Sequence, residues 1–209
     1  MSDLLHIEVS PLGDHSISRA ITQEFLNAYK AKNPSAVIVS KDFAANPIPH
    51  LDIEAISAGY TPEADRSASM TAKFNARLAL IQEIKDAKHI VISTPMWNWS
   101  VPSVLKAWID NVLIPGVLDG ATPATSTAAK FTFIVSQGGS YKPGAPRAGW
   151  DYETGYLKQF AGAVGSKDIE VVLSEFGLAG IAPGMEAFTE QKAASIAAAK
   201  ESAKQRAAA

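Results

Sequence analysis

The chain of 209 residues carries 19 basic and 21 acidic side chains, and a net charge of −2 without a basic cluster argues against nucleic acid as a partner. It contains no cysteine, which excludes disulfides, thiolate metal sites and thiol catalysis. An apolar fraction of 47% is ordinary for a globular protein, so the length predicts one domain over residues 1–209. With neither a signal-peptide pattern nor an apolar run of about 18 residues, we expect a cytoplasmic protein that does not bind membranes.

Short β-branched runs alternate with longer helical stretches along the chain. In order, we expect a strand at residues 4–9, a helix at 17–32, a strand at 37–43, a helix at 67–87 and a strand at 90–94. A helix at 101–113, a strand at 131–136, a helix at 151–164, a strand at 169–174 and a final helix at 185–208 follow. This alternation predicts an α/β fold, a doubly wound five-stranded parallel sheet with helices on both faces.

Two of these segments carry clear packing signals. In the helix at 67–87, apolar residues at spacings of four, four, three and three form one stripe: Met70, Phe74, Leu78, Ile81 and Ile84. The strand at 90–94 contains no charged residue, so we expect it to be buried on both faces. Ligands of such sheets bind beyond the carboxyl ends of the strands, which directs attention to the loops after the first, third and fourth strands.

The loop after the first strand, residues 10–19, combines hydroxyl groups with the start of a helix. Ser10, Ser16 and Ser18 supply the hydroxyls, and the helix N-terminus supplies unpaired N–H groups at the positive end of its dipole. This arrangement suits a phosphate monoester, which His15 would help to neutralise. An ordinary serine N-cap would give the same pattern. The chain contains neither a Walker loop nor a Gly-x-Gly-x-x-Gly fingerprint.

The loop after the third strand contains the turn Pro-Met-Trp-Asn-Trp at residues 95–99, with two of the four tryptophans of the chain. Large aromatic side chains at the end of a buried strand need something to pack against, and a flat, mostly apolar ring is one answer. Pro95 and Asn98 shape the turn, and Asn98 also offers a donor and an acceptor to a ring edge. Alternatively, Trp97 and Trp99 cap the core or fill a subunit interface.

The loop after the fourth strand, residues 136–141, contains the pair Gly138 and Gly139. Paired glycines let a backbone approach a ligand closely and present N–H groups to it, although a simple tight turn would look the same. Together, one loop favours phosphate, one favours a ring face and one favours hydrogen bonds to a ring edge. Flavin mononucleotide (FMN) satisfies all three.

These motifs resemble those of the FMN-dependent NADH azoreductases, relatives of the flavodoxin-like quinone reductases. Family members carry a Ser-Pro-x-Gly-like loop with Ser-x-Ser, an Ala-Ala-Asn-Pro-Ile-Pro segment, a Pro-Met-Tyr-Asn-Phe turn before a Leu-Lys helix, and a Ser-Arg-Gly-Gly turn. Similar motifs occur here, in the same order, at residues 10–18, 44–49, 95–99 with 105–106, and 136–139. The resemblance covers nearly the whole chain, and it implies a flavodoxin-like fold.

The resemblance further implies noncovalently bound FMN and a homodimer with its active sites at the subunit interface. The phosphate would be held by Ser10, Ser16, Ile17 and Ser18. The isoalloxazine would be lined by Met96, Trp97, Asn98 and Trp99, next to Pro95, and along its other edge by Ser136, Gln137, Gly138 and Gly139.

The chain departs from the family pattern in three places. Gln137 replaces the arginine of the Ser-Arg-Gly-Gly turn, and both aromatic positions of the Pro-Met-Tyr-Asn-Phe turn are tryptophan. Residues 114–130 lack the aromatic side chains that help to form the substrate pocket in relatives. The substrate is therefore less constrained by the resemblance than the cofactor is.

The implied reaction is ping-pong: NADH or NADPH passes a hydride to FMN and leaves, and a quinone or an azo compound then takes the same position and receives two electrons. No side chain need act as an obligatory acid or base, because the flavin carries the chemistry. The four scattered histidines lack the spacing of metal ligands. The alternatives are a flavodoxin-type electron carrier, whose strongly acidic surface this chain lacks, and a flavin-binding module without turnover.

Overall fold

Five parallel strands form one sheet with the order β2-β1-β3-β4-β5 in the computed structural model, which describes residues 2–209. The strands are β1 (Ser2–Glu8), β2 (Ile38–Asp42), β3 (Ala87–Pro95), β4 (Lys130–Ser136) and β5 (Ile169–Ser174). All five lie within two or three residues of the segments expected from the sequence. The predicted doubly wound parallel sheet is confirmed.

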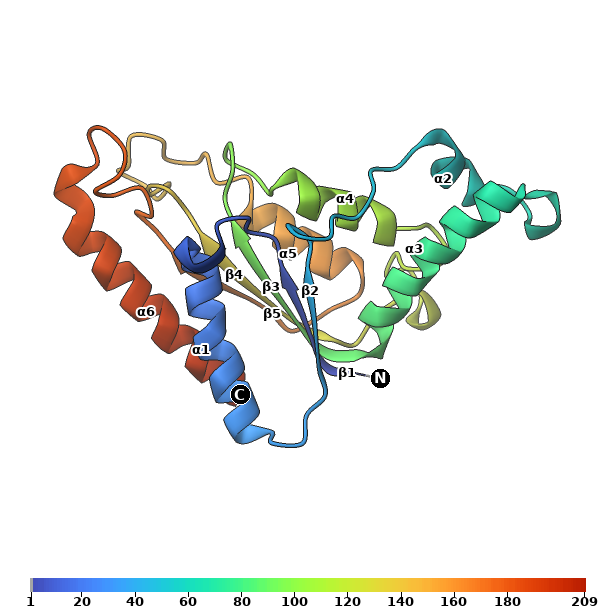
Figure 1. Ribbon diagram of the computed structural model, residues 1–209, viewed down its shortest axis with the longest axis horizontal. Helices are drawn as coiled ribbons and strands as arrows, with labels where there is room; N and C mark the ends of the chain where they lie inside the picture. The colour runs from blue at the N-terminus through green and yellow to red at the C-terminus, as the bar shows by residue number, and fades with distance from the viewer. Residues whose placement is uncertain (1) are drawn as a thin grey trace.

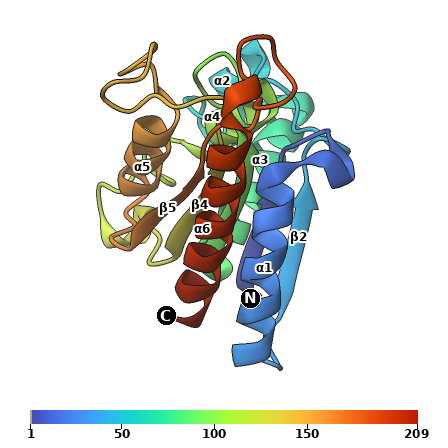
Figure 2. The same ribbon diagram turned by 90° about the vertical axis from the view of Figure 1, so that its left-hand side faces the viewer.

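Six α-helices surround the sheet on both faces (Figure 1). They are α1 (Ile17–Lys32), α2 (Ile53–Ala58), α3 (Ala68–Asp86), α4 (Ser103–Val112), α5 (Thr154–Ala163) and α6 (Thr189–Ala208). Helices α1 and α6 lie side by side on one face, as Figure 2 shows, while α3, α4 and α5 cover the other. The strands all run upward in Figure 1, so their carboxyl ends lie on the same, upper side of the sheet.

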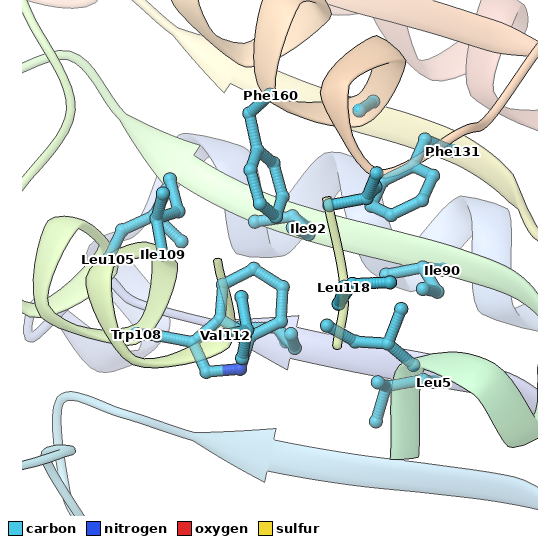
Figure 3. Packing of buried hydrophobic residues seen from close by; sticks show 14 of the residues in the cluster. Leu5, Ile90, Ile92, Leu105, Trp108, Ile109, Val112, Leu118, Phe131 and Phe160 are labelled. Carbon is cyan, nitrogen blue, oxygen red and sulfur yellow. The ribbon is translucent and has the colours of Figure 1, made fainter. Parts of the chain in front are cut away.

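The apolar stripe predicted on α3 faces the core. Phe74, Ile81 and Ile84 are buried, and Met70 and Leu78 pack against them. Strand β3 is buried along almost its whole length, as the absence of charge at 90–94 predicted. Figure 3 shows the centre of this core, where Trp108 of α4 meets Phe160 of α5 with ring centroids 5.5 Å apart.

Helix α2 is the element that the sequence reading missed. It has only six residues and follows a loop with two prolines, so it offers no long periodic pattern. Its start is nevertheless defined, because the Asp52 side chain accepts a hydrogen bond from the backbone N–H of Ala55. The helix packs on α3 at one end of the molecule.

Three predicted helices begin at least two residues later than expected, and the first is α4, which starts at Ser103 rather than at 101. Helix α5 starts at Thr154 rather than at 151, because the Asp151 side chain accepts hydrogen bonds from the backbone N–H groups of Glu153 and Thr154 and so caps the helix from outside. Helix α6 starts at Thr189, after a 3₁₀ turn at Glu186–Phe188. Within residues 2–209, no helix is long and apolar enough to cross a membrane.

Candidate functional site

A cavity of about 310 Å³ opens at the carboxyl ends of β1, β3, β4 and β5. Most of the site residues predicted from the sequence line it, and they come from all three predicted loops: Ser10, Ser16, Ile17, Pro95, Met96, Trp97, Ser136, Gln137 and Gly138. His15, expected near a phosphate, lines it as well. A cavity of this size lies within the range of small-molecule sites.

Four predicted site residues do not line this cavity. Ser18 is fully buried, with its hydroxyl oxygen 3.2 Å from that of Ser16. Asn98 is exposed at the tip of its turn, and Trp99 packs against Trp150 instead. At Gly139, an added Cβ would meet no atom within 4 Å, so no protein contact requires a glycine there.

The loop after β1 presents free donors at the start of α1. Ser16 caps this helix, since its hydroxyl accepts a hydrogen bond from the backbone N–H of Arg19 at 3.2 Å. The backbone N–H groups of Ile17 and Ser18 have no hydrogen-bond partner within residues 2–209. Two free N–H groups at the positive end of a long helix form a suitable place for an anion.

A buried carboxyl group shapes this loop from below. Glu8, the last residue of β1, accepts a hydrogen bond from the backbone N–H of Ser10 at 3.0 Å. Burial raises the pKa of the Glu8 carboxyl, while the Ser10 hydrogen bond and the nearby Arg19 guanidinium oppose that shift. The backbone N–H of Ser10 is therefore occupied, and only its hydroxyl remains for a ligand.

The tryptophan turn after β3 is closed by its own backbone. Trp97 and Ser100 exchange two backbone hydrogen bonds of 3.0 Å, and the two residues between them, Asn98 and Trp99, have φ angles of 48° and 66°. Few non-glycine residues adopt this left-handed region, and a bulky side chain does so at a cost. The N–H of Met96 donates to the carbonyl oxygen of Ser136 at 2.8 Å, which joins the turn to the loop after β4.

A series of buried and partly buried hydrogen bonds runs beneath both loops. The Gln137 amide nitrogen donates to Asp151 Oδ2 at 2.9 Å, and Asp151 Oδ1 accepts the backbone N–H of Glu153 at 3.0 Å. The Glu153 carboxyl in turn accepts the Thr94 hydroxyl at 3.1 Å. These hydrogen bonds therefore connect the end of β4 to the end of β3. They include Gln137, the glutamine that replaces the arginine expected from the family resemblance.

Glu153 is the most perturbed carboxyl of this region. It is fully buried, and its Oε2 atom has no hydrogen-bond partner among residues 2–209. Burial raises its pKa from 4.5 to about 9, although the Thr94 hydrogen bond opposes the shift. Glu153 is therefore a neutral carboxylic acid at pH 7.

The sequence reading missed the contribution of a fourth loop. Gly177, Leu178 and Ile181, which follow β5, line the cavity, as do Lys192 of α6 and Leu12 of the first loop. At Gly177, an added Cβ would lie 3.1 Å from the carbonyl oxygen of Gln137, so this position favours glycine. The rule that led to the other loops also applies to the end of β5, and the Phe-Gly pair at 176–177 was the available signal.

Within residues 2–209, no three His, Asp or Glu side chains gather as metal ligands do. The charged groups at the cavity are instead the cation of Lys192, which donates to the carbonyl oxygen of Ala179 at 3.1 Å, and the positive end of the α1 dipole. The walls between them are largely apolar, with Trp97, Leu178 and Ile181 each at least 40% exposed. This combination suits a ligand with an anionic end and an apolar ring.

Comparison with known proteins adds independent findings. A family model described as a flavodoxin-like fold matches residues 2–207. The chain is 36% identical over 211 residues to an FMN-dependent NADH:quinone oxidoreductase of Parafrankia sp. (strain EAN1pec), with 100% of both chains covered.

Two solved structures share the fold. The azoreductase from Bacillus anthracis str. Sterne superposes with a TM-score of 0.85 at 20% identity, with 99% of each chain covered. An FMN-dependent NADH-azoreductase from Bacillus anthracis str. Ames Ancestor, in complex with FMN, has a TM-score of 0.82 at 22% identity, with 100% of this chain and 98% of that chain covered.

The buried Glu153 predicts an unusual dependence of stability on pH. Between pH 4.5 and about 9, the folded protein keeps a proton that the unfolded chain loses, so the free energy of unfolding falls as the pH rises through this range. Glu153→Gln is neutral at every pH and can still accept the Thr94 hydroxyl. We expect it to be more stable than the parent by roughly 2 kcal/mol or more at pH 8, with the difference shrinking toward pH 5.

Urea unfolding at pH 5, 7 and 8 measures this difference. Glu190→Gln makes the same substitution at an exposed position at the start of α6 and should keep the parental pH dependence. Equal pH dependence in Glu153→Gln and the parent would show that Glu153 is ionised in the folded protein.

Proposed function

The chain belongs to the flavodoxin-like family that includes the FMN-dependent NADH:quinone oxidoreductases, and we propose that it binds FMN and passes two electrons from NADH to a quinone. The observation that carries this proposal is that one cavity combines the free N–H groups of α1, the tryptophan turn and the Gly138 loop. These three parts of the cavity would bind a phosphate, an apolar ring and a polar ring edge, respectively.

The residues present fit FMN at both ends. For the phosphate, the site offers the N–H groups of Ile17 and Ser18 and the hydroxyls of Ser10 and Ser16. For the ring, it offers the side chains of Met96 and Trp97 on one side and the backbone near Gly138 on the other. We still propose that Ser18, Asn98, Trp99 and Gly139 contribute to FMN binding, although their side chains do not line the cavity. Their backbone groups, or the open space beside the turn, would provide the contact.

Bound FMN would supply the hydride acceptor and donor, and the protein supplies position, hydrogen bonds and exclusion of water. We propose a ping-pong order, in which NADH leaves before the acceptor takes its place against the same ring. Trp97 would cover the reacting ring, while Gln137 is held in place by Asp151. No acid or base from the chain is required for this role, and Glu153, with its pKa raised by burial to about 9, keeps its proton at neutral pH.

The finer features of the reaction belong to the same proposal. NADPH is an alternative donor, azo compounds are alternative acceptors, and the cytoplasm, where NADH is produced, is the proposed compartment. We expect quinones to be the better acceptors, because a planar quinone needs only to stack on the flavin. A flavodoxin-type carrier and a flavin-binding module without turnover remain the competing functions.

Mixing the FMN-loaded protein with NADH in the absence of oxygen tests the reaction. We expect rapid loss of the visible absorbance of the flavin, followed by its return when 1,4-naphthoquinone or an azo dye is added, with the quinone reacting faster. A flavin that stays oxidised for minutes would favour a binding module. Reaction of the reduced protein with redox proteins but not with quinones would favour a carrier.

The proposed phosphate site can be tested without turnover. Ser16→Asp keeps a good helix cap but places a negative charge beside the phosphate, whereas Ser16→Asn is a neutral cap of the same shape. We expect Ser16→Asp to bind FMN at least about tenfold more weakly than Ser16→Asn, since one like charge at close range costs about 1.4 kcal/mol or more. Riboflavin, which lacks the phosphate, should bind both variants alike.

Fluorescence titration of the apoprotein measures these affinities. If Ser16→Asp weakened FMN and riboflavin equally, the phosphate would not lie at the start of α1. Unaltered FMN binding in both variants would lead to the same conclusion.

We also propose a homodimer that uses an exposed apolar surface formed by Ile53 and Ile56 of α2 and by Tyr60, which follows the helix. Ile53 and Tyr60 are each 76% exposed, and a short helix with such side chains is typical of an interface. Sedimentation equilibrium should give a dimer for the parent and a monomer for Ile53→Glu. Val37→Glu, which adds the same charge at an exposed apolar position before β2, should remain dimeric. A monomeric parent would contradict the proposal.

A further inference from the structure

Three side chains form a cluster on the outer side of the tryptophan turn. The rings of Trp99 and Trp150 meet edge to face, with their centroids 5.1 Å apart and their planes at 87°. The guanidinium carbon of Arg147 lies 5.6 Å from the centroid of Trp99 and 5.8 Å from that of Trp150. Both distances fall within the range of cation–π attraction, so the two rings hold this cation in place.

The guanidinium of Arg147 has no other partner within residues 2–209. No carboxylate lies within ion-pair distance of it, and it takes part in no side-chain hydrogen bond there. The nearby Asp151 carboxylate is already occupied by Gln137, Thr154 and two backbone N–H groups. Arg147, which is exposed, therefore presents its full set of N–H donors to solvent while it contacts the two rings.

The segment that carries the cluster is tied by backbone hydrogen bonds to the turn after β3 and to the loop after β4, which both contribute residues to the cavity. The backbone N–H of Tyr152 donates to the carbonyl oxygen of Trp99 at 3.0 Å, and that of Gly149 donates to the carbonyl oxygen of Tyr141 at 3.0 Å. Asp151, next to Trp150, holds Gln137, which lines the cavity. Trp97, two residues before Trp99, lines it too. The Arg147 cation therefore lies next to the turn that carries Trp97 into the cavity, in contact with the Trp99 ring on that turn.

We propose that the Trp99–Arg147–Trp150 cluster binds an anionic group, a sulfonate, carboxylate or phosphate, carried by the ring compound that reacts at this site. The inference rests on the proposed function and deepens it by assigning a specificity-determining residue. A planar guanidinium binds such oxygen groups through two parallel hydrogen bonds. The exposed indole of Trp150 and the half-buried indole of Trp99 add apolar contact to the aromatic body that bears the group.

The left-handed backbone at Trp99 supports this assignment. Its φ of 66° is unfavourable for a bulky residue. What the conformation achieves is the contact of the Trp99 ring with Trp150 and Arg147. Strain of this kind is typical of sites that position a ligand group.

Steady-state kinetics with a matched pair of acceptors tests the proposal. 1,4-Naphthoquinone and 1,4-naphthoquinone-2-sulfonate differ in one anionic group. In Arg147→Gln we expect the KM for the sulfonate to rise roughly five- to tenfold, with little change in kcat, while the KM for the neutral quinone stays within about twofold. Arg147→Lys keeps the charge but not the planar fork, so its KM for the sulfonate should lie between those of the parent and of Arg147→Gln.

Lys167→Gln provides the matched control. It removes one positive charge from an exposed position before β5, at the opposite end of the sheet, and should change neither KM. If Arg147→Gln and Lys167→Gln behaved alike, or if Arg147→Gln raised both KM values equally, the proposal would be wrong. If Arg147→Gln raised the KM for NADH but not the KM for the sulfonate, the bound anion would be the pyrophosphate of the dinucleotide and the assignment to the acceptor would be wrong. If it raised the KM for the sulfonate but not the KM for NADH, the bound anion would be that of the acceptor.

Binding of naphthalene-2-sulfonate, followed by calorimetry, separates this inference from the proposed function, because this probe cannot be reduced at the site. The parent should bind it more tightly than Arg147→Gln does, whether or not FMN is present. If this difference holds but neither quinone is reduced, the anion site stands and the oxidoreductase proposal fails. If both quinones are reduced but the probe binds both proteins equally, the anion site fails and the oxidoreductase proposal stands.

Discussion

Strand β1 pairs with β2 on one side and with β3 on the other, and the site depends on this arrangement. Leu5 lies opposite Val39 in one neighbour and Ile90 in the other, so the strand order reverses at β1. The chain leaves β1 toward α1 on one face of the sheet and leaves β3 toward α4 on the other (Figure 1). The two loops therefore diverge above the sheet, and the space between them is where an α/β sheet accepts a ligand.

Burial limits the number of formal charges beneath the loops that follow β3 and β4. Asp151 is anchored by four donors, whereas Glu153, two residues later, has one donor and an unpartnered oxygen. Two adjacent carboxylates would repel each other there, and burial resolves this by raising the pKa of Glu153 to about 9. Gln137 satisfies Asp151 without adding a charge, whereas an arginine would bring a cation. A neutral acid and a neutral amide thus connect the two loops with only one formal charge.

The fold was largely predictable because its signals are long or periodic. The stripe on α3 and the uncharged strand β3 each specify burial directly. Helix α2 was not predictable in this way, since its six residues expose the large side chains of Ile53 and Ile56 and bury only the small ones of Ala55 and Ala58. The start of α5 was placed too early because Asp151 is compatible with a helical pattern, and only its hydrogen bonds identify it as a cap.

The site was predictable at the level of loops, since strand ends converge in any parallel sheet, but not at the level of side-chain contacts. The sequence does not reveal that Trp97 faces the cavity while Trp99 turns away from it, because the direction depends on the left-handed backbone of Asn98 and Trp99. Nor does it reveal the pairing of Trp99 with Arg147, which lies 48 residues later along the chain. Positive charge therefore occurs at three separate places, the start of α1 and Lys192 at the cavity and Arg147 beside the tryptophan turn. A cofactor phosphate at α1 would leave Arg147 to the ring compound that reacts with the cofactor.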